Sequence, residues 1–410
     1  MVSLSLSRMF VCVGGLLLMA GADRPQFLGP GRDGTSTEKG LLTSWPREGP
    51  AVVWGKQVGA GFSGPVVAGG RLILFHRVGD REVVECLDAG SGKGLWKFGY
   101  PTAYQDDFGF DEGPRSTPLV AGKRVYTLGA EGVLHCLDLG TGKKIWGRPL
   151  NTDYQVAKGF FGVATSPLLE GGLVLVNVGG KGAGIVALAK ETGKEVWRAT
   201  DQGASYSSPV AATIDGTRHV FFFTREGLVS LDPGNGHVRF SKRWRSRLDA
   251  SVNAAAPVVA GEYVFISACY QTGAALLRVR PEAAEEVWKS DDVLSNHYAT
   301  SIHHAGYLYG FDGRQEHGAR LRCVEMKTGK VRWTKEGFGC GSMVLAGGNL
   351  IVLTEDGELV LVEATPRAYR EKSRASLLGK PCRALIALAN GRLYARDGKK
   401  LVCVNLERPK

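Results

Sequence analysis

Several features are absent from this sequence of 410 residues, and each absence narrows what the protein can be. The apolar run from Met9 to Ala20 has 12 residues, which is too short to span a bilayer comfortably, and no second candidate span follows it. No C-x-x-C-H motif for covalent haem attachment is present. Aromatic and basic residues are not interleaved, so the formal net charge of +11 does not indicate nucleic-acid binding.

The N-terminal segment has the features of an export signal. Arg8 precedes the apolar run, and Ala20-Gly21-Ala22 forms a small-x-small cleavage pattern after it. We therefore expect a signal peptide over residues 1–22, with an uncleaved anchor or an ordinary buried segment as alternatives. Because no Cys follows the small residues, a bacterial lipoprotein anchor is disfavoured. The expected product is a soluble monomer with no membrane span, exported to the periplasm or out of the cell.

What the sequence does contain is glycine, 57 residues in all, and an internal repeat. A small-small-Pro step that opens an apolar run recurs eight times, in intact or degenerate form, with successive starts 41 to 53 residues apart. It begins at Ser63, Ser116, Thr165, Ser207, Ala255, Thr300, Gly341 and Arg383. Each unit contains four short apolar strands separated by glycine turns. Units of this length with four antiparallel strands are typical of propeller blades.

The two ends of the repeat region complement each other. The eighth unit, which ends in "KLVCVNLERPK", has three strands, whereas "AVVWGKQ" at Ala51–Gln57 is a strand with no unit before it. We predict that this N-terminal strand is the fourth strand of the last blade, because such closure leaves no open interface in the ring. The predicted fold is an all-β, eight-bladed propeller over residues 51–410, preceded by a lead segment at 23–50.

A second motif recurs inside the units. "LDLGTGKKIW" at Leu137–Trp146 has close versions at Leu87–Trp96, Leu188–Trp197 and Val324–Trp333, and the GH and WD signatures of WD40-type repeats are absent. From Ala51 onward, the chain resembles the pyrroloquinoline-quinone (PQQ) enzyme-like repeat family. That family includes quinoprotein alcohol and sugar dehydrogenases, and also BamB, the non-enzymatic scaffold of the outer-membrane β-barrel assembly machine. The leader from Arg24 to Trp54 resembles that of secreted propellers typical of planctomycetes.

The resemblance implies a role for the repeated aromatic residue, which is tryptophan docking between blades. The column consists of Trp54, Trp96, Trp146, Trp197, Phe240, Trp288 and Trp333, with a weak eighth position near Tyr369. A ligand site repeated around a ring would need seven ligands, whereas every blade needs a docking residue. A ring on the outermost strand can lie against the next blade while its N–H donates to a backbone carbonyl there.

The cysteines fall into two groups. Cys86, Cys136, Cys323 and Cys403 occupy the same position in four different blades, which places most of them too far apart to bridge, so we expect reduced core thiols. Cys340 and Cys382 instead precede the small-small step of blades seven and eight, near the axis, which leaves a disulfide between them open.

The loops that lead into the innermost strands should converge on one mouth of the channel, where propeller ligands commonly bind. They contain Arg115, Lys158, Tyr206, Asn253, His297, Tyr298 and Arg383, a set that could bind an anionic or polar ligand. The longest loop, "YQDDFGFDEGPR", adds four acidic residues between Asp106 and Glu112, which could hold a cation or be a solvated loop.

Two functions remain open at this point. The first is a secreted, non-enzymatic binding or scaffold module for a protein or surface glycan, BamB-like in architecture, with no cofactor, metal or catalytic residue. The second is a PQQ-dependent alcohol or sugar dehydrogenase, or a degenerate relative of one. For that enzyme the resemblance implies PQQ with calcium held by acidic and amide side chains, and in many members a disulfide between adjacent cysteines. This sequence has no Cys-Cys pair, and its missing lipid-attachment Cys departs from BamB.

Overall fold

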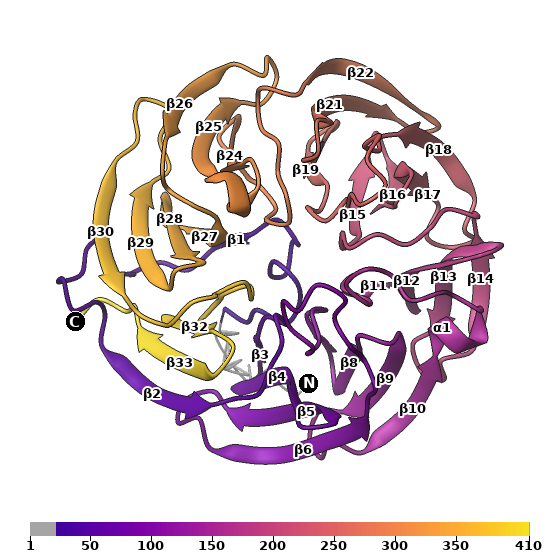
Figure 1. Cartoon of the computed structure of the whole chain (residues 1–410), viewed down its shortest axis with the longest axis horizontal. Coiled ribbons are helices and arrows are strands. Elements are labelled where there is room, and N and C mark those ends of the chain that lie inside the picture. Colours follow the sequence, from indigo (N-terminus) through magenta and orange to yellow (C-terminus); the bar gives the residue numbers. More distant parts are fainter. Residues whose placement is uncertain (1–21, 410) are drawn as a thin grey trace, which may run out of the picture.

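The structure, a computed structural model, describes residues 22–409, so the predicted signal peptide lies outside the described residues except for Ala22. The chain forms a ring of eight antiparallel sheets of four strands each, one of which gains a short fifth strand (Figure 1). The predicted fold class is confirmed. In the part of the chain that the structure describes, no helix is long and apolar enough to cross a membrane.

Each of the first four blades runs from the channel outward in chain order. Blade 1 contains β3 (Val66–Ala68), β4 (Arg71–Val78), β5 (Arg81–Asp88) and β6 (Gly94–Pro101), and blade 2 contains β7 (Leu119–Ala121), β8 (Arg124–Leu128), β9 (Val133–Asp138) and β10 (Lys144–Pro149). Blade 3 contains β11 (Leu168–Glu170), β12 (Leu173–Gly180), β13 (Ala183–Ala189) and β14 (Glu195–Ala199), and blade 4 contains β15 (Val210–Ile214), β16 (Thr217–Phe223), β17 (Gly227–Leu231) and β18 (Val238–Arg243). A short helix, α1 (Leu150–Asp153), follows β10.

The remaining blades follow the same plan until the ring closes. Blade 5 contains β19 (Val258–Ala260), β20 (Tyr263–Ala268), β21 (Gly273–Arg280) and β22 (Ala283–Ser290), and blade 6 contains β23 (Ile302–His304), β24 (Tyr307–Asp312), the turn η1 (Gln315–His317), β25 (Arg320–Glu325) and β26 (Val331–Lys335). Blade 7 contains β27 (Gly341–Ala346), β28 (Asn349–Thr354), β29 (Glu358–Glu363) and β30 (Glu371–Ser376), with β1 (Thr35–Ser36) parallel to β27. Blade 8 contains β31 (Ala387–Ala389), β32 (Arg392–Arg396), β33 (Lys400–Asn405) and, as predicted, β2 (Val52–Gln57) as its outermost strand.

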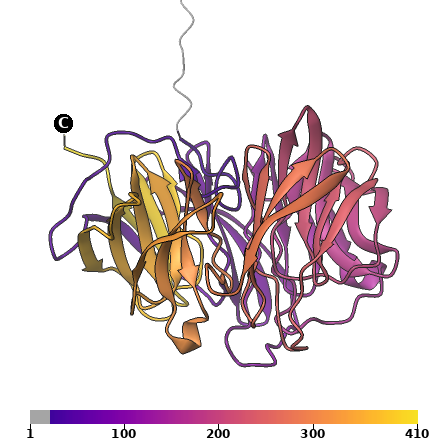
Figure 2. The same ribbon diagram turned by 90° about the horizontal axis from the view of Figure 1, so that it is seen from above.

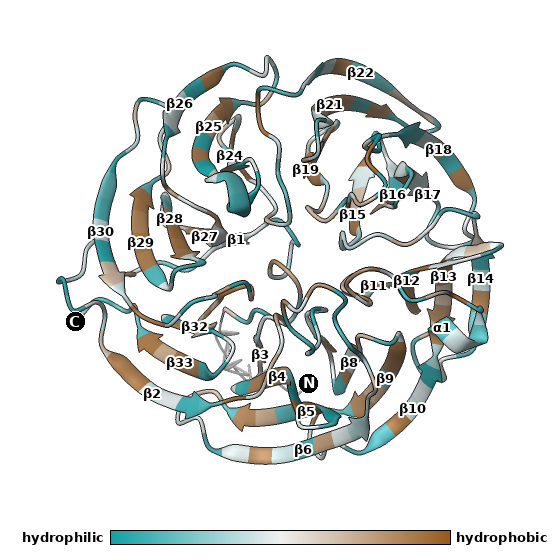
Figure 3. Ribbon diagram, in the orientation of Figure 1, coloured by the Kyte–Doolittle hydropathy of each residue, from teal (hydrophilic) through white to brown (hydrophobic). Residues whose placement is uncertain are grey.

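The hydrophobic core lies in the seams between neighbouring blades. Eight apolar clusters are present, and each one joins side chains of two adjacent blades, including the pair formed by blades 8 and 1. The middle strands are apolar on both faces, whereas the outermost strands are mixed (Figure 3). Because burial of apolar area is the main stabilising contribution, the ring is held together largely across its seams.

The contact expected of a docking tryptophan is present at six of the seven positions of the aromatic column. Trp54, Trp96, Trp146, Trp197, Trp288 and Trp333 each donate the indole N–H to a backbone carbonyl of the next blade, at 2.8–3.1 Å. The docked indole ring also explains why the turn that faces it contains a glycine. Gly142 has a φ of +71°, and a Cβ on it would lie 2.4 Å from the Trp96 ring, so only glycine admits the indole so closely.

The seam between blades 4 and 5 is built differently. Phe240 packs in the apolar cluster shared by these blades but has no N–H to donate, and the facing turn between β21 and β22 has no glycine. Ion pairs cross the outer part of this seam instead, from Arg239 to Glu282 and from Lys242 to Glu286 at 3.0 Å. The seventh docking position is therefore apolar but lacks the hydrogen bond of the others.

The eighth position of the aromatic column was predicted wrongly. By strand register Ser373, not Tyr369, stands opposite Leu361 where the other blades carry tryptophan, and Tyr369 packs edge-on against Trp333 of blade 6. The leader fills the gap. Trp45 is buried in the apolar cluster of blades 7 and 8, and its backbone N–H donates to Ser373 Oγ at 2.9 Å.

The leader also crosses the central channel (Figure 1). Arg24 pairs with Val67 of β3 in blade 1 through two backbone hydrogen bonds of 2.9 Å, and β1 pairs with β27 in blade 7. Between them the Arg32 guanidinium donates to Pro167 O of blade 3 at 3.0 Å. Burial lowers the pKa of Arg24 to about 10 and that of Arg32 to about 9. The lead segment is thus an integral part of the fold.

The cysteines of the mid-blade column are free and fully buried, as predicted: Cys86, Cys136, Cys323 and Cys403. Cys340 and Cys382 are also free, and the Cys382 thiol donates to Gly379 O at 3.0 Å. The disulfide that the sequence left open between them is therefore not formed in this structure. Burial raises the pKa of both thiols to about 12.

Candidate functional site

The loops that precede the innermost strands gather on one face of the ring, as the sequence predicted. The loop after β6 and the turn η1 project from that face in the side view, away from the C-terminus (Figure 2). There they surround a cavity of about 410 Å³. The leader contributes Phe27 to the lining, so the segment that crosses the channel forms part of the cavity wall.

The lining is dominated by aromatic side chains from different blades. They are Phe27, Phe62, Phe108, Phe110, Phe160, Phe161, Tyr206, Tyr270 and Tyr298. Phe108 and Phe110, both in the loop after β6, are 52% and 44% exposed, although they stack on each other and pack against Phe161 with tilted rings. Large apolar side chains left exposed together around a cavity are typical of binding surfaces.

The predicted site residues separate into three groups. Arg115, Tyr206, His297, Tyr298 and Arg383 line the cavity. Lys158 does not line it, and its ammonium pairs with Asp107 at 2.5 Å on the exposed rim. Asn253 is buried and structural, because its amide group donates to Thr224 O at 2.8 Å and to Trp244 O at 2.9 Å. The expectation that Asn253 faces a ligand was therefore wrong.

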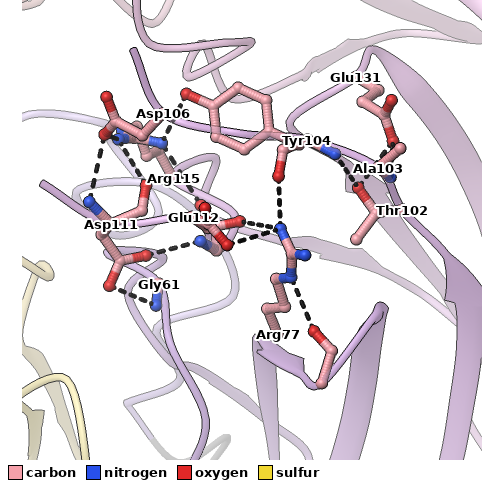
Figure 4. A network of polar contacts seen from close by, with 12 residues as sticks. Gly61, Arg77, Thr102, Ala103, Tyr104, Asp106, Asp111, Glu112, Arg115 and Glu131 are labelled. Carbon is pink, nitrogen blue, oxygen red and sulfur yellow. Dashed lines mark hydrogen bonds and ion pairs between the residues drawn. The ribbon is translucent and has the colours of Figure 1, made fainter. Parts of the chain in front are cut away.

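The acidic loop is a network of internal contacts (Figure 4). Asp106 pairs with Arg115 at 2.6 Å and also accepts the backbone N–H groups of Phe108 and Asp111. Asp111 accepts the N–H groups of Gly113 at 2.6 Å and of Gly61 at 3.1 Å. These carboxylates fold the loop and tie it to blade 1, so neither alternative drawn from the sequence, a cation site or a solvated loop, describes them.

Two of the three arginines that line the cavity, Arg115 and Arg383, lie between aromatic rings. The Arg115 guanidinium lies 5.6 Å from the centre of the Phe62 ring and 5.8 Å from that of Phe161. The Arg383 guanidinium lies 5.5 Å from the centre of the Phe62 ring and 5.0 Å from that of Phe110. Because Phe110 also meets Phe161, the five side chains form a closed circuit of cation–π and aromatic contacts. This circuit joins the loops of blades 1, 2, 3 and 8.

The remaining ionisable groups of the lining are also paired. Arg383 donates to Glu355 at 2.7 Å, and Tyr298 donates to the same carboxylate at 2.7 Å. His297 lies 2.6 Å from Gln315 Oε1 through Nδ1 and 2.7 Å from the Tyr270 hydroxyl through Nε2, and burial lowers its pKa. An anion that entered the cavity would therefore meet guanidinium groups that already have carboxylate partners.

A row of hydroxyl groups lines another part of the cavity. Thr117, Ser166 and Ser208 occupy the second position of the small-small-Pro step in blades 2, 3 and 4. The Thr117 N–H donates to Ser166 Oγ and the Ser166 N–H to Ser208 Oγ, both at 2.9 Å. The Tyr206 hydroxyl likewise accepts the Phe161 N–H at 3.1 Å. Within residues 22–409 the hydroxyl protons of these side chains have no acceptor.

The sequence of residues 79–335 matches a known family, described as outer membrane protein assembly factor BamB. The chain belongs to the BamB family. None of the curated protein sequences compared with the chain matches it significantly.

Solved structures of BamB and of quinohaemoproteins share the fold. BamB from Moraxella catarrhalis is 17% identical with a TM-score of 0.63, covering 88% of this chain and 98% of its own. The quinohaemoprotein alcohol dehydrogenase from Comamonas testosteroni is 13% identical with a TM-score of 0.65, covering 95% of this chain and 81% of its own. The enzyme ADHIIG from Pseudomonas putida HK5 is 12% identical with a TM-score of 0.57, covering 88% and 76%. At these identities the likeness concerns the fold alone.

The cavity of this BamB family member does not fit PQQ with calcium. Calcium prefers six to eight oxygen ligands, including carboxylates. Among the described residues no group of three or more His, Cys, Asp or Glu side chains is arranged to hold a metal ion. The carboxylates nearest the cavity are already bound, Asp106 to Arg115, Glu355 to Arg383, and Glu316 to Arg314 at 3.2 Å.

Sequence reasoning missed most of the apolar lining of this family member. The aromatic residues lie in "FGF" at 108–110 and "GFFG" at 159–162, within loops whose polar residues alone had indicated a binding site. Phe27 could not be assigned to the site, because nothing in the repeat shows that the leader enters the channel. The turn η1, with Arg314 and Glu316, lies between two strands of blade 6 rather than in a loop before an innermost strand, so the repeat does not place it at the mouth.

Proposed function

We propose that this protein is an exported, non-enzymatic binding or scaffold propeller whose mouth cavity receives part of a partner. The observation that carries the proposal is the aromatic lining, with Phe108 and Phe110 about half exposed on one loop. Rings of this size contribute much of the energy of protein interfaces when they become buried. Export rests on the pattern of residues 1–22.

The state of the ionisable groups supports binding rather than catalysis. A general base must be within hydrogen-bond reach of a substrate and free to accept its proton. Glu355 is engaged by Arg383 and Tyr298, and both nitrogens of His297 have partners within the protein. These groups orient the loops, which leaves the aromatic rings and hydroxyl groups to meet a ligand.

Site-specific photocrosslinking tests the binding role. A photoreactive benzoylphenylalanine at position 110 should crosslink one defined partner in the exported fraction of the source cells. The matched control carries the same residue at position 95, because Leu95 is similarly exposed (46%) but lies on the outermost strand of blade 1. Equal crosslinking at both positions, or none at position 110, would contradict a partner site at the mouth.

Reconstitution separates this proposal from the enzyme alternative. After incubation with PQQ and calcium chloride we expect no change in the PQQ absorption spectrum and no dye reduction with alcohols or sugars, because the paired carboxylates leave no cation site. Dye reduction that depends on both PQQ and an alcohol or sugar would favour the dehydrogenase and refute the scaffold proposal.

A further inference from the structure

The mouth cavity has two chemically different walls. Phe27, Phe62, Phe108, Phe110 and Phe161 present aromatic faces that carry no polar group. The other wall is polar and consists of Thr117, Ser166 and Ser208, which we call the hydroxyl row. These three residues are almost fully buried yet line the cavity. A ligand that satisfies both walls needs a large apolar group beside a series of hydrogen-bond acceptors.

The hydroxyl row can act as a donor series. Both serine oxygens already accept one backbone N–H at 2.9 Å, whereas their O–H protons have no acceptor within the described residues, so these protons are the donors that an occupant would pair with. Thr117 makes no side-chain hydrogen bond within the described residues, and its neighbours in the row belong to the next two blades. The row thus repeats at the spacing of adjacent blades. A buried O–H left without an acceptor costs free energy, which an occupant with regularly spaced oxygens would recover.

The charge state of the cavity indicates a neutral occupant. Arg115, Arg383 and Arg314 each have a carboxylate partner at 2.6–3.2 Å. Displacing any of these carboxylates with a ligand anion would leave a part-buried acid unpaired, which is costly. The cavity therefore selects against free anions, anionic lipid head groups and acidic peptides alike.

We propose that the occupant is an extended segment of a partner protein carrying a large apolar side chain, aromatic or leucine. The side chain enters the phenylalanine-lined part of the cavity, and the backbone carbonyls beside it accept hydrogen bonds from the hydroxyl row. The proposal rests on the proposed function and names the chemistry of its partner.

The composition of the rim favours a protein over a lipid or a sugar. Protein interfaces have an apolar centre enriched in aromatic residues and arginine, surrounded by a polar rim. Here Arg115 and Arg383 are only 10% and 19% exposed among the phenylalanines, whereas the side chains of the ion pairs Lys158–Asp107 and Arg314–Glu316 are 34–54% exposed. An acyl chain would leave the hydroxyl row without acceptors. A sugar could stack its C–H face on a phenylalanine, but the carboxylates nearest the cavity are already paired with arginines and leave its hydroxyl groups few free acceptors.

Selection from a random dodecapeptide phage library against the immobilised protein tests this inference. We expect enrichment of sequences with a large apolar residue and no preference for net charge. The best synthetic peptide, labelled with fluorescein, should bind the Phe108→Ala variant about ten-fold more weakly, because a ring of the cavity is removed. It should bind the Thr117→Val variant about five-fold more weakly through loss of one hydrogen bond. The Leu95→Ala variant, which removes an exposed side chain far from the mouth, should bind normally.

The outcomes separate this inference from the proposed function. Selection of charged motifs, no enrichment at all, or binding that is unchanged in Phe108→Ala would overturn the peptide assignment. If a glucan hexasaccharide or phosphatidylethanolamine vesicles bind in a Phe108-dependent way while no peptide is enriched, the occupant is a glycan or a lipid. A protein crosslinked from position 110 would still support the proposed function in those cases, whereas failure of both experiments would refute both. Matching thermal unfolding of Phe108→Ala and the parent protein excludes loss of fold as the cause.

Discussion

Replacing Trp45 with alanine removes the one docking tryptophan that the propeller takes from its leader rather than from a blade. The indole is buried in the apolar cluster of blades 7 and 8, beside Ser373 at the position where other blades carry their own tryptophan. A large aromatic side chain deleted from such a site costs about 3–5 kcal/mol, because apolar contacts are lost and a cavity remains. We expect a loss of this size in the free energy of unfolding.

The phenylalanine variants make the prediction more specific. The Trp45 indole N–H has no hydrogen-bond partner in the part of the chain that the structure describes, whereas that of Trp197 donates to Pro233 O at 3.0 Å. Trp45→Phe should therefore cost only about 1 kcal/mol, through imperfect packing. Trp197→Phe should cost about 1–3 kcal/mol more, because the part-buried Pro233 carbonyl loses its donor.

Urea unfolding, followed by circular dichroism, measures all three variants against the parent protein. The decrease in the urea midpoint should be smallest for Trp45→Phe, larger for Trp197→Phe and largest for Trp45→Ala. The slope of the unfolding free energy against urea concentration should not change. A loss below about 1 kcal/mol for Trp45→Ala would show that the leader only lies on the surface, contrary to its proposed place in the seam. Equal losses for the two phenylalanine variants would show that the Trp45 indole has an acceptor in solution.

Three further predictions concern the turns, a buried histidine and the mouth loop. Gly142→Ala should lower the urea midpoint of unfolding much more than Gly122→Ala does. Both glycines have a positive φ, but only at Gly142 would a Cβ meet an indole ring. Equal shifts of the midpoint would contradict the docking role of the turn. Burial lowers the pKa of His135 from its ordinary value of 6.5 to about 4 in the folded protein. Between these two values the unfolded chain binds a proton at this histidine and the folded protein does not. The stabilising contribution of the neutral His135 is therefore full above pH 6.5 and is lost as the pH falls towards 4. His135→Phe should therefore show a smaller drop in urea midpoint between about pH 7 and about pH 4.5 than the parent, and an identical drop would exclude this histidine. Arg115→Met leaves the buried Asp106 carboxylate without its cation, at a cost of about 3–5 kcal/mol, so chymotrypsin should cut the loop at Phe108 or Phe110 faster; an unchanged cleavage rate would show that the ion pair does not hold the loop.

The sequence by itself determined the architecture, because that information is local and periodic. The number of small-small-Pro steps gave the number of blades. The strand at Ala51–Gln57 has no blade of its own in the sequence, and it predicted the ring closure in which β2 pairs with β33. The turn glycine and the tryptophan four residues after it recur in the motif, and they predicted docking because each blade must pack against its neighbour in the same way. The shared column of Cys86 and its equivalents could be assigned to the core for the same reason.

Only the tertiary structure decided what breaks the period. Trp45 and Phe27 lie in a leader with no repeat, so their places beside Ser373 and in the mouth cavity depend on a path through the channel that spacing does not encode. The same holds for the candidate site. The sequence predicted which loops meet at the mouth, but not which residues their side chains contact. The sequence suggested that Arg115 and Arg383 could bind an anion. In the structure each of them pairs with a carboxylate and lies against aromatic rings. Side chains from blades distant in sequence meet at the axis, and charge pairing there is set by distances in space, which is why a polar site in the sequence became an apolar cavity in the fold.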